Sequence, residues 1–185
     1  QKRNLQKHEW QHSNTAGLQG FVMNTRRKPL DDIRVRRALV LSFDYESINN
    51  RLFYGLYKRS YSLFTNGSMA AEGKPQGAER ALLNSVRNKL PAAVFDEPVP
   101  LPPQTDPALG VRPNLVQARA LLQSAGYRYR GGVLVDKPGR PLVLEFLSPT
   151  KTYERVTAKW QRDLAKIGIT LNVRVADAAV YQKRR

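Results

Sequence analysis

The chain has 185 residues, with 31 Lys and Arg against 15 Asp and Glu, so its formal net charge is +16. This length suits one substantial core, either a single domain or one lobe of a larger protein. Cysteine is absent, which excludes disulfides, thiolate metal sites and a cysteine nucleophile. No apolar run approaches the roughly 20 residues that would span a bilayer.

The N-terminal part of the chain is polar and then briefly apolar. We expect residues 1–17 to form a lead-in strand or linker, because they have no sustained hydrophobic period. Residues 18–25 then predict a short strand. The chain starts at Gln1 without a leader and ends in a basic pair. We therefore expect a fragment of a longer protein, with any signal peptide outside it.

Two consecutive helices follow, and each is preceded by an Asp. The apolar period predicts a helix over Ile33–Phe43, with Asp31 or Asp32 as its N-cap. Asp44 ends that helix and caps a second one over Glu46–Tyr54. A glycine after the second helix is a typical stop signal.

The middle of the chain changes character at a proline-rich stretch. Residues 76–90 predict a third helix, whereas residues 91–113 contain seven prolines and exclude regular helix or central strand. This stretch also carries apolar side chains that a disordered tether would usually lack. We therefore expect residues 91–113 to be an ordered surface loop.

The C-terminal part predicts alternating helices and strands. A helix capped by Asn114 leads into a hairpin whose arms are residues 127–135 and 141–147. An amphipathic helix over residues 150–167 and a strand over 169–175 complete a βαβ unit, so the strands before and after that helix should be parallel. A further short helix begins at Asp177.

One motif suggests zinc chemistry. The segment from His8 to His12 matches H-E-x-x-H, which on a helix supplies two zinc ligands and a general base, Glu9. No apolar face would bury this segment as a helix, and the chain has no third histidine. We expect no metal site, no cofactor and no catalytic residues, since the serines also lack a G-x-S-x-G context. A zinc hydrolase remains a remote alternative.

The positive charge supports another alternative, a basic nucleic-acid-binding domain. Such a domain would concentrate Lys and Arg on one helix or stripe, but here they occur in short groups along the whole sequence. No zinc-finger, helix-turn-helix or RNA-recognition pattern accompanies them. We therefore expect no nucleic acid as partner, and interpret the charge as a solvated surface that attracts anionic ligands.

An aromatic and basic loop follows the second helix and is the best candidate for ligand contacts. Its composition suits the binding of flat or polar groups against aromatic faces, and a buried loop would instead be small and apolar. For two of its aromatic rings, burial in the core is an equally good interpretation. The candidate ligand-binding residues are Tyr57, Arg59, Tyr61, Phe64 and Asn66.

The order of these motifs resembles a known family. The stretch FVMNTRRKPLDDIRVRRAL, the continuation LSFDYESINNRLFYGLYKRSYSLFTNG and the later segment NLVQARALLQSAGYRYRGGVLVDKPGRPLVLEFL are similar to extracellular solute-binding proteins of family 5. These are the oligopeptide, dipeptide and nickel class that serves ABC importers. Within this class the chain resembles the YejA-type branch, which is associated with microcin C-like peptide uptake. The resemblance covers the chain from Gly20 onward.

The resemblance implies an α/β lobe of a bilobal, type II periplasmic-binding-protein-like fold, with a mixed sheet flanked by helices. Residues 18–185 would be the second lobe, and the first lobe would lie elsewhere in the same chain. The protein would not be an enzyme: it would capture short peptides or peptide-like compounds in the Gram-negative periplasm and deliver them to an inner-membrane ABC-transporter permease. The strong positive charge departs from the family and leaves the ligand class open.

Overall fold

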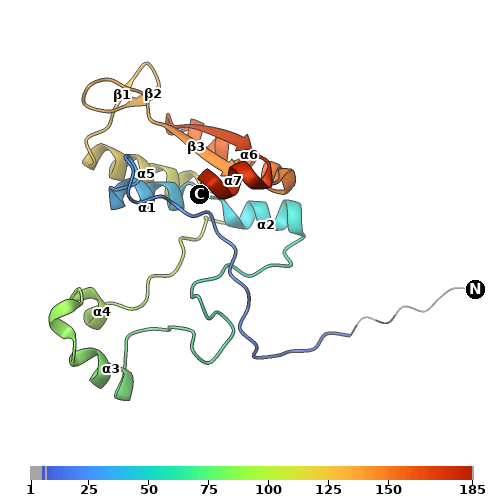
Figure 1. Ribbon diagram of the computed structural model, residues 1–185, viewed down its shortest axis with the longest axis vertical. Coiled ribbons are helices and arrows are strands. Elements are labelled where there is room, and N and C mark those ends of the chain that lie inside the picture. The colour runs from blue at the N-terminus through green and yellow to red at the C-terminus, as the bar shows by residue number, and fades with distance from the viewer. Residues whose placement is uncertain (1–5, 7, 185) are drawn as a thin grey trace, which may run out of the picture. The chain divides into compact units, whose positions relative to one another are not determined.

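The computed structural model describes residue 6 and residues 8–184, and it divides the chain into two compact units (Figure 1). We call Phe21–Arg59 together with Pro103–Arg185 the core unit, and Gln1–Gly20 together with Ser60–Pro102 the insertion unit. All described strands belong to the core unit. No helix in the described part of the chain is long and apolar enough to cross a membrane.

The first two helices form as their capping residues predict. Helix α1 covers Ile33–Leu41, and the Asp32 side chain accepts a hydrogen bond from a backbone N–H of its first turn. Helix α2 covers Tyr45–Phe53, with Asp44 in the same role. Both caps satisfy N–H groups that have no partner inside a helix, so the predicted caps are confirmed, although the helices end two residues and one residue earlier than predicted.

Helix α5 covers Arg112–Ser124 and begins two residues before the predicted cap, Asn114. Pro113 is tolerated in the first turn because its missing N–H would have no intrahelical partner there. Asn114 lies within the first turn of the helix and is buried, and its side-chain amide donates to the carbonyl of Gln104 at 2.9 Å. The prediction of Asn114 as the N-cap was wrong, and this residue instead holds the preceding loop.

The predicted hairpin is also placed differently. Strands β1, Arg128–Arg130, and β2, Val133–Val135, pair antiparallel within what was predicted as a single arm. Gly131 and Gly132 between them both have positive φ, 56° and 81°, which suits the tight two-residue turn of a hairpin. In the described residues the predicted second arm pairs with the first through an isolated bridge between Val135 and Pro141, and the N–H of Leu142 donates to the carbonyl of Leu134 at 2.9 Å.

The predicted βαβ unit is present. Strand β3, Val143–Ser148, and strand β4, Thr170–Val175, pair parallel over their full length. Between them lie a short 3-10 helix, η2 (Lys151–Tyr153), and helix α6 (Glu154–Ala165). The strands therefore form two separate two-stranded sheets rather than one mixed sheet. The last helix, α7, covers Ala178–Arg184.

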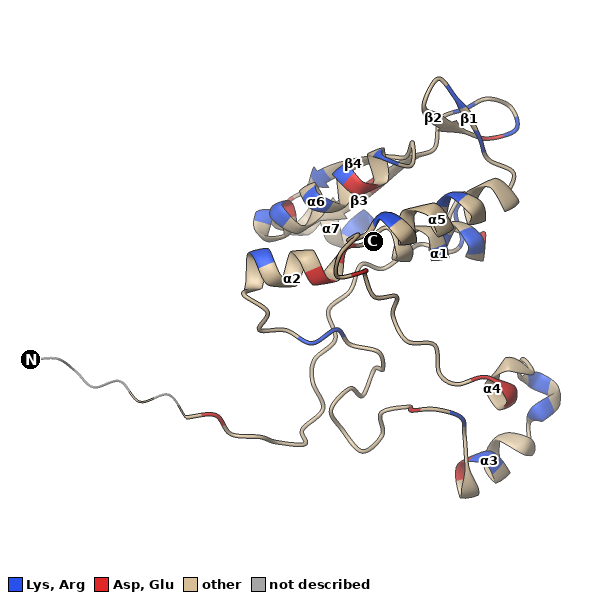
Figure 2. Ribbon diagram, turned by 180° about the vertical axis from the view of Figure 1, so that it is seen from behind, with Lys and Arg blue, Asp and Glu red and all other residues tan. Residues whose placement is uncertain are grey.

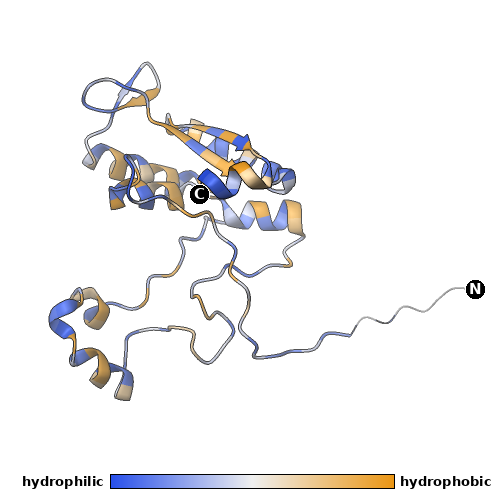
Figure 3. Ribbon diagram, viewed as in Figure 1, coloured by the Kyte–Doolittle hydropathy of each residue, from blue (hydrophilic) through white to orange (hydrophobic). Residues whose placement is uncertain are grey.

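A single hydrophobic core holds the core unit together. It lies among α1, α5, α6 and the strands, where Figure 3 shows apolar segments on α5 and β3. The interior face of α6 predicted from sequence is confirmed, since Val156, Trp160 and Leu164 are at most 8% exposed. The buried members are Val35, Ala38, Leu39, Val111, Leu115, Ala118, Leu122, Leu134, Leu142, Leu144, Trp160, Leu164, Ile167, Ile169 and Leu171.

The strand predicted over residues 18–25 does not form. Its apolar residues serve packing instead of pairing: Phe21 and Met23 are partly buried against the core, while Val22 is 99% exposed. Alternating burial predicts a strand, but a strand also needs a neighbour to pair with. No partner strand is present for this segment in the described residues.

The insertion unit contains short helices and loops. The helix predicted over residues 76–90 is broken into α3 (Gly77–Asn84) and a 3-10 helix, η1 (Arg87–Lys89), and neither has a buried residue. A four-residue helix, α4 (Ala93–Asp96), lies inside the proline-rich stretch, between its first two prolines. Its Phe95 is buried and packs under the Arg87 guanidinium, 4.0 Å from the ring centre.

Candidate functional site

The five predicted ligand-binding residues belong to different units. Tyr57 and Arg59 lie in the core unit, whereas Tyr61, Phe64 and Asn66 lie in the insertion unit.

The backbone of Tyr57 is fixed by one side chain of α2. The Asn49 amide donates to the Tyr57 carbonyl at 2.7 Å and accepts from the Tyr57 N–H at 3.2 Å. The Tyr57 ring packs edge-on against Phe53 but stays 61% exposed. Tyr57 thus presents an accessible aromatic face on an anchored backbone.

Arg59 makes internal contacts that limit its freedom to meet a ligand. Its guanidinium lies 5.4 Å from the centre of the Tyr45 ring and donates to the carbonyl of Pro103. Burial lowers the pKa of Arg59, and the nearby Glu46 partly opposes this shift. Burial also raises the pKa of Tyr45, whose hydroxyl is buried without a hydrogen-bond partner in the described structure.

Asn66 closes a turn that holds the N-terminal segment of the insertion unit. Its φ of 72° is left-handed, a conformation that Asn tolerates better than most residues. Its amide donates to the carbonyls of His12 and Asn14, both at 2.9 Å. The H-E-x-x-H segment lies here as exposed chain, and the described residues contain no group of three potential metal ligands.

Tyr61 lines a groove of about 610 Å³ within the insertion unit. Its hydroxyl donates to Glu72 at 2.8 Å, and this hydrogen bond raises the pKa of Tyr61 because ionisation would break it. Apart from Glu72, the remaining walls are apolar and come from Ala71, Gly73 and residues 98–101. Phe64 does not line the groove, and its ring is 41% exposed.

The carboxyl ends of β3 and β4 form a second candidate site, which the sequence analysis missed. Open α/β sheets bind ligands at the carboxyl ends of parallel strands. Here Ser148 Oγ donates to the carbonyl of Thr150 at 2.7 Å, and Thr150 caps η2 through the N–H of Thr152. The N–H of Ala176 donates to the Ser148 carbonyl at 2.9 Å. The predicted βαβ unit was the signal that could have located this edge.

An aromatic cluster lies beside this edge. Phe21 stacks on Trp160 with ring centres 5.6 Å apart and meets Phe146 of β3 edge-on at 4.6 Å. Phe43 and Tyr153 complete the cluster. The segment that enters the core unit is therefore anchored next to β3 and η2, the elements that form the candidate edge.

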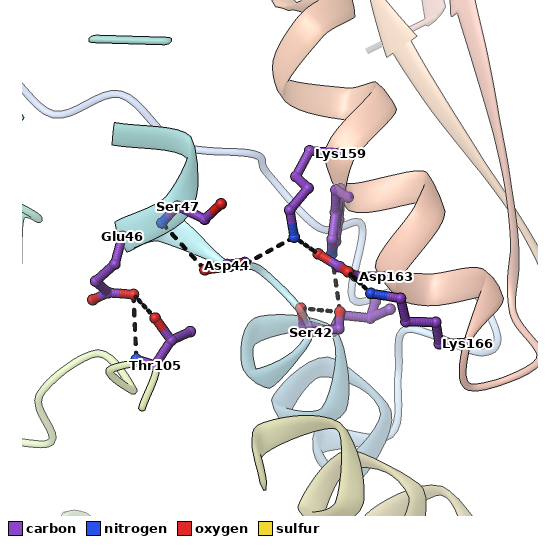
Figure 4. A network of polar contacts seen from close by, with 10 residues as sticks. Ser42, Asp44, Glu46, Ser47, Thr105, Lys159, Asp163 and Lys166 are labelled. Atoms are coloured by element: carbon purple, nitrogen blue, oxygen red, sulfur yellow. Dashed lines mark hydrogen bonds and ion pairs between the residues drawn. The ribbon is translucent and has the colours of Figure 1, made fainter. Parts of the chain in front are cut away.

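A buried ionic network joins α6 to the turn between α1 and α2 (Figure 4). Lys159 bonds to Asp44 at 2.8 Å and also to Asp163, which is fully buried. Lys166 reaches the other oxygen of Asp163 at 2.8 Å. Next to these ions the Trp160 indole donates to Ser42 at 2.9 Å. The network neutralises its buried charges and fixes how these elements pack.

Comparison with known proteins gives a match along the whole chain. A family model described as bacterial extracellular solute-binding proteins, family 5 Middle, matches residues 1–185. The probable peptide-binding protein YejA of Agrobacterium fabrum is 36% identical over 168 residues, which are 90% of this chain and 27% of that protein. The peptidoglycan-binding protein YepA of the same organism is 32% identical over 170 residues, or 91% of this chain and 28% of that protein.

A solved structure shows the same fold. The oligopeptide-binding protein AppA from Bacillus subtilis, in complex with a nonapeptide, is 19% identical with a TM-score of 0.54. The similarity covers 87% of this chain and 26% of that chain. The chain spans about a quarter of the length of the curated relatives it matches.

Proposed function

Because the chain belongs to the bacterial extracellular solute-binding proteins of family 5, we propose that the protein containing it is the solute-binding component of an ABC importer and captures short peptides or peptide-like compounds. The match of the family model over residues 1–185 carries this proposal, and it confirms the resemblance found in the sequence. This family consists of solute-binding proteins, so its members bind rather than catalyse.

The ligand class rests on similarity. Relatives include a probable peptide-binding protein and a peptidoglycan-binding protein, and AppA was solved with a nonapeptide. Peptides and peptide-bearing cell-wall fragments share backbone amides and free carboxylates. The positive charge of the chain favours ligands with more carboxylates than ammonium groups.

Binding would need no covalent chemistry. Polar groups at the carboxyl edge of β3 and β4 would meet the ligand backbone, and enclosure of the ligand would exclude water. Among the predicted residues, the exposed rings of Tyr57 and Phe64 and the groove residue Tyr61 are the better candidates. Arg59 and Asn66 already make several internal contacts.

We further propose that the protein acts in the periplasm and delivers its ligand to an inner-membrane permease. The remainder of the longer protein would supply the rest of the binding surface. These proposals follow from the family, whose members are extracellular solute-binding proteins.

Isothermal calorimetry of the full-length protein against defined peptides of two to nine residues tests the proposal. We expect a saturable binding heat for at least one peptide class, and weaker binding after Tyr57→Ala. Leu56→Ala is the matched control, since Leu56 is adjacent and 77% exposed. Absence of binding heat for every peptide and cell-wall peptide tested would refute the peptide assignment.

A further inference from the structure

Positive charge is unevenly divided between the units. In the core unit 24 Lys and Arg stand against 10 Asp and Glu, whereas in the insertion unit the numbers are 7 and 5. Figure 2 shows basic segments on α1, α5 and α6. Charge that is dispersed in sequence is therefore concentrated in one folded unit.

Within the core unit, a groove of about 1190 Å³ collects cationic side chains from three helices. Helix α2 contributes Arg51 and helix α5 contributes Arg112 and Arg119, while Lys159 and Lys166 come from α6 and the residue after it. The groove therefore has five cations along its walls. How many of them can bind a ligand depends on which are already paired with a carboxylate.

The acidic residues of the groove already have partners. Asp44 pairs with Lys159 at 2.8 Å. Glu46 accepts from the N–H and the hydroxyl of Thr105 at 3.3 and 2.9 Å. Asp106 accepts from two backbone N–H groups of its own turn, at 2.8 and 2.7 Å. None of these acids forms an ion pair with a groove arginine in the described part of the chain.

The two lysines are likewise occupied. Lys159 pairs with Asp44 and Asp163, and Lys166 pairs with the second oxygen of Asp163, as Figure 4 shows. Because Asp163 is fully buried beneath them, both ammonium groups are held at the groove wall and partly neutralised. The arginines are the cations left without a carboxylate.

One of these arginines is held in place by a neighbour. The Arg119 guanidinium lies 4.6 Å from the centre of the Tyr129 ring, and its Nε donates to the Tyr129 hydroxyl at 3.2 Å. That hydroxyl donates to the carbonyl of Ile167, itself a groove residue, at 2.9 Å. The two terminal nitrogens of Arg119 have no hydrogen-bond partner in the described structure and remain free to donate.

We propose that this groove is a binding site for a phosphate-bearing anion, contacted by Arg51, Arg112 and Arg119. Guanidinium groups match phosphate oxygens in pairs of parallel hydrogen bonds, which a compact ammonium cannot do. The groove includes the carboxyl end of α6, which lies at the amino edge of β3 and β4. It is therefore separate from the carboxyl edge proposed for solute capture.

Calorimetry of the full-length protein with inorganic pyrophosphate, at fixed ionic strength, tests this site. The groove variant combines Arg51→Gln, Arg112→Gln and Arg119→Gln. The control variant changes three exposed arginines of the same unit that do not line the groove and removes the same charge: Arg37→Gln, Arg155→Gln and Arg162→Gln. We expect the groove variant to lose about tenfold or more in affinity and the control less than about threefold.

Sedimentation with phosphatidylglycerol vesicles, against phosphatidylcholine vesicles, distinguishes a lipid headgroup from a free anion. Groove-dependent binding of either probe supports the site, and it shows which source the site prefers. Equal weakening by both triple variants, or no binding of either probe, would overturn it. Equal weakening of oligonucleotide binding by both variants would instead indicate bulk charge and also count against the groove. Peptide affinity should be unchanged in the groove variant, so this test and that of the proposed function fail independently.

Discussion

The two units of the chain are stabilised in different ways. The core unit buries apolar side chains from helices and strands that are distant in sequence, and a buried ionic network adds to this packing. In the described part of the insertion unit, Phe95 is the only fully buried apolar side chain, and polar contacts hold the loops. The contrast separates a packed scaffold from a loop-rich unit with little buried apolar surface, and segments of that kind are where binding loops are commonly found.

The largest effect should come from breaking the buried ionic network. Asp163→Ala leaves Lys159 and Lys166 without their shared carboxylate, and removal of one partner of a buried pair typically costs about 3–5 kcal/mol. Hydrogen exchange of the full-length protein, resolved along the chain, should show faster exchange in α6 with the insertion unit unchanged. Adding Lys159→Met should recover part of the loss, and no recovery would contradict the ionic explanation.

A matched pair of leucines tests the packing difference directly. Leu164→Ala, at a site with no exposed surface, should destabilise the core unit by about 3 kcal/mol through lost burial and a cavity. Leu82→Ala in α3, where the side chain is 72% exposed, should change stability by less than about 0.5 kcal/mol. Urea unfolding of the full-length variants measures both, and a similar loss for the two would remove the distinction between the units.

Loss of the hydrogen bonds from Asn66 to the N-terminal segment should destabilise the protein less, and only locally. Asn66→Ala removes both hydrogen bonds to the N-terminal segment and puts a strained side chain at positive φ, for a loss of about 1–2 kcal/mol. Asn66→Gly removes the bonds but relieves the strain. Limited proteolysis near residues 8–16 should therefore rise more for Ala than for Gly, with the core unit unaffected. Equal cleavage of both variants and the parent would show that these hydrogen bonds do not hold the N-terminal segment.

The smallest effects on folding stability should come from two groups that titrate at opposite ends of the pH range. Hydrogen bonds from Arg34 lower the pKa of Asp32, so the ionised cap stabilises α1 above the ordinary pKa of Asp. That contribution is lost as pH falls through the lowered pKa. Asp32→Asn keeps a capping oxygen and should flatten this acid limb in stability measured by urea unfolding against pH.

Tyr61, in the insertion unit, should make stability depend on pH at the alkaline end of the range instead. The hydrogen bond to Glu72 raises the pKa of Tyr61. The contribution of this hydrogen bond to folding stability is therefore present below the ordinary pKa of Tyr and is lost as pH rises through the raised pKa. An NMR titration of labelled tyrosine should show Tyr61 ionising later than a free tyrosine. Glu72→Ala removes the acceptor and should return the pKa of Tyr61 toward that of a free tyrosine, and an unchanged titration would contradict the contact.

Local signals in the sequence predicted much of the core unit. Asp32 and Asp44 precede their helices as caps, and the apolar period of α6 identified its buried face. The hairpin prediction was wrong because Gly131 and Gly132 form the turn itself rather than part of one arm, as paired glycines at positive φ typically do. The strand over residues 18–25 failed because pairing requires a non-local partner that local alternation does not reveal.

The candidate sites were less predictable. The carboxyl edge of β3 and β4 follows from the predicted βαβ unit, whereas the polar loop has the more conspicuous local composition. Asn66 precedes a glycine, a pair typical of turns at positive φ, so its structural role also had a local signal. The groove arginines had none, since Arg51 and Arg119 belong to different helices and the occupied state of the neighbouring acids depends on tertiary contacts.

The hydrogen bond from Arg59 to the carbonyl of Pro103 has a consequence for modularity. These residues are the last before and the first after residues 60–102, so a side-chain hydrogen bond within the core unit links the two ends of that 43-residue segment. A segment whose two ends are anchored in one folded unit can change in length at little cost in closure entropy. We therefore expect residues 60–102 to tolerate divergence or exchange between homologues, while the fold of the core unit stays the same.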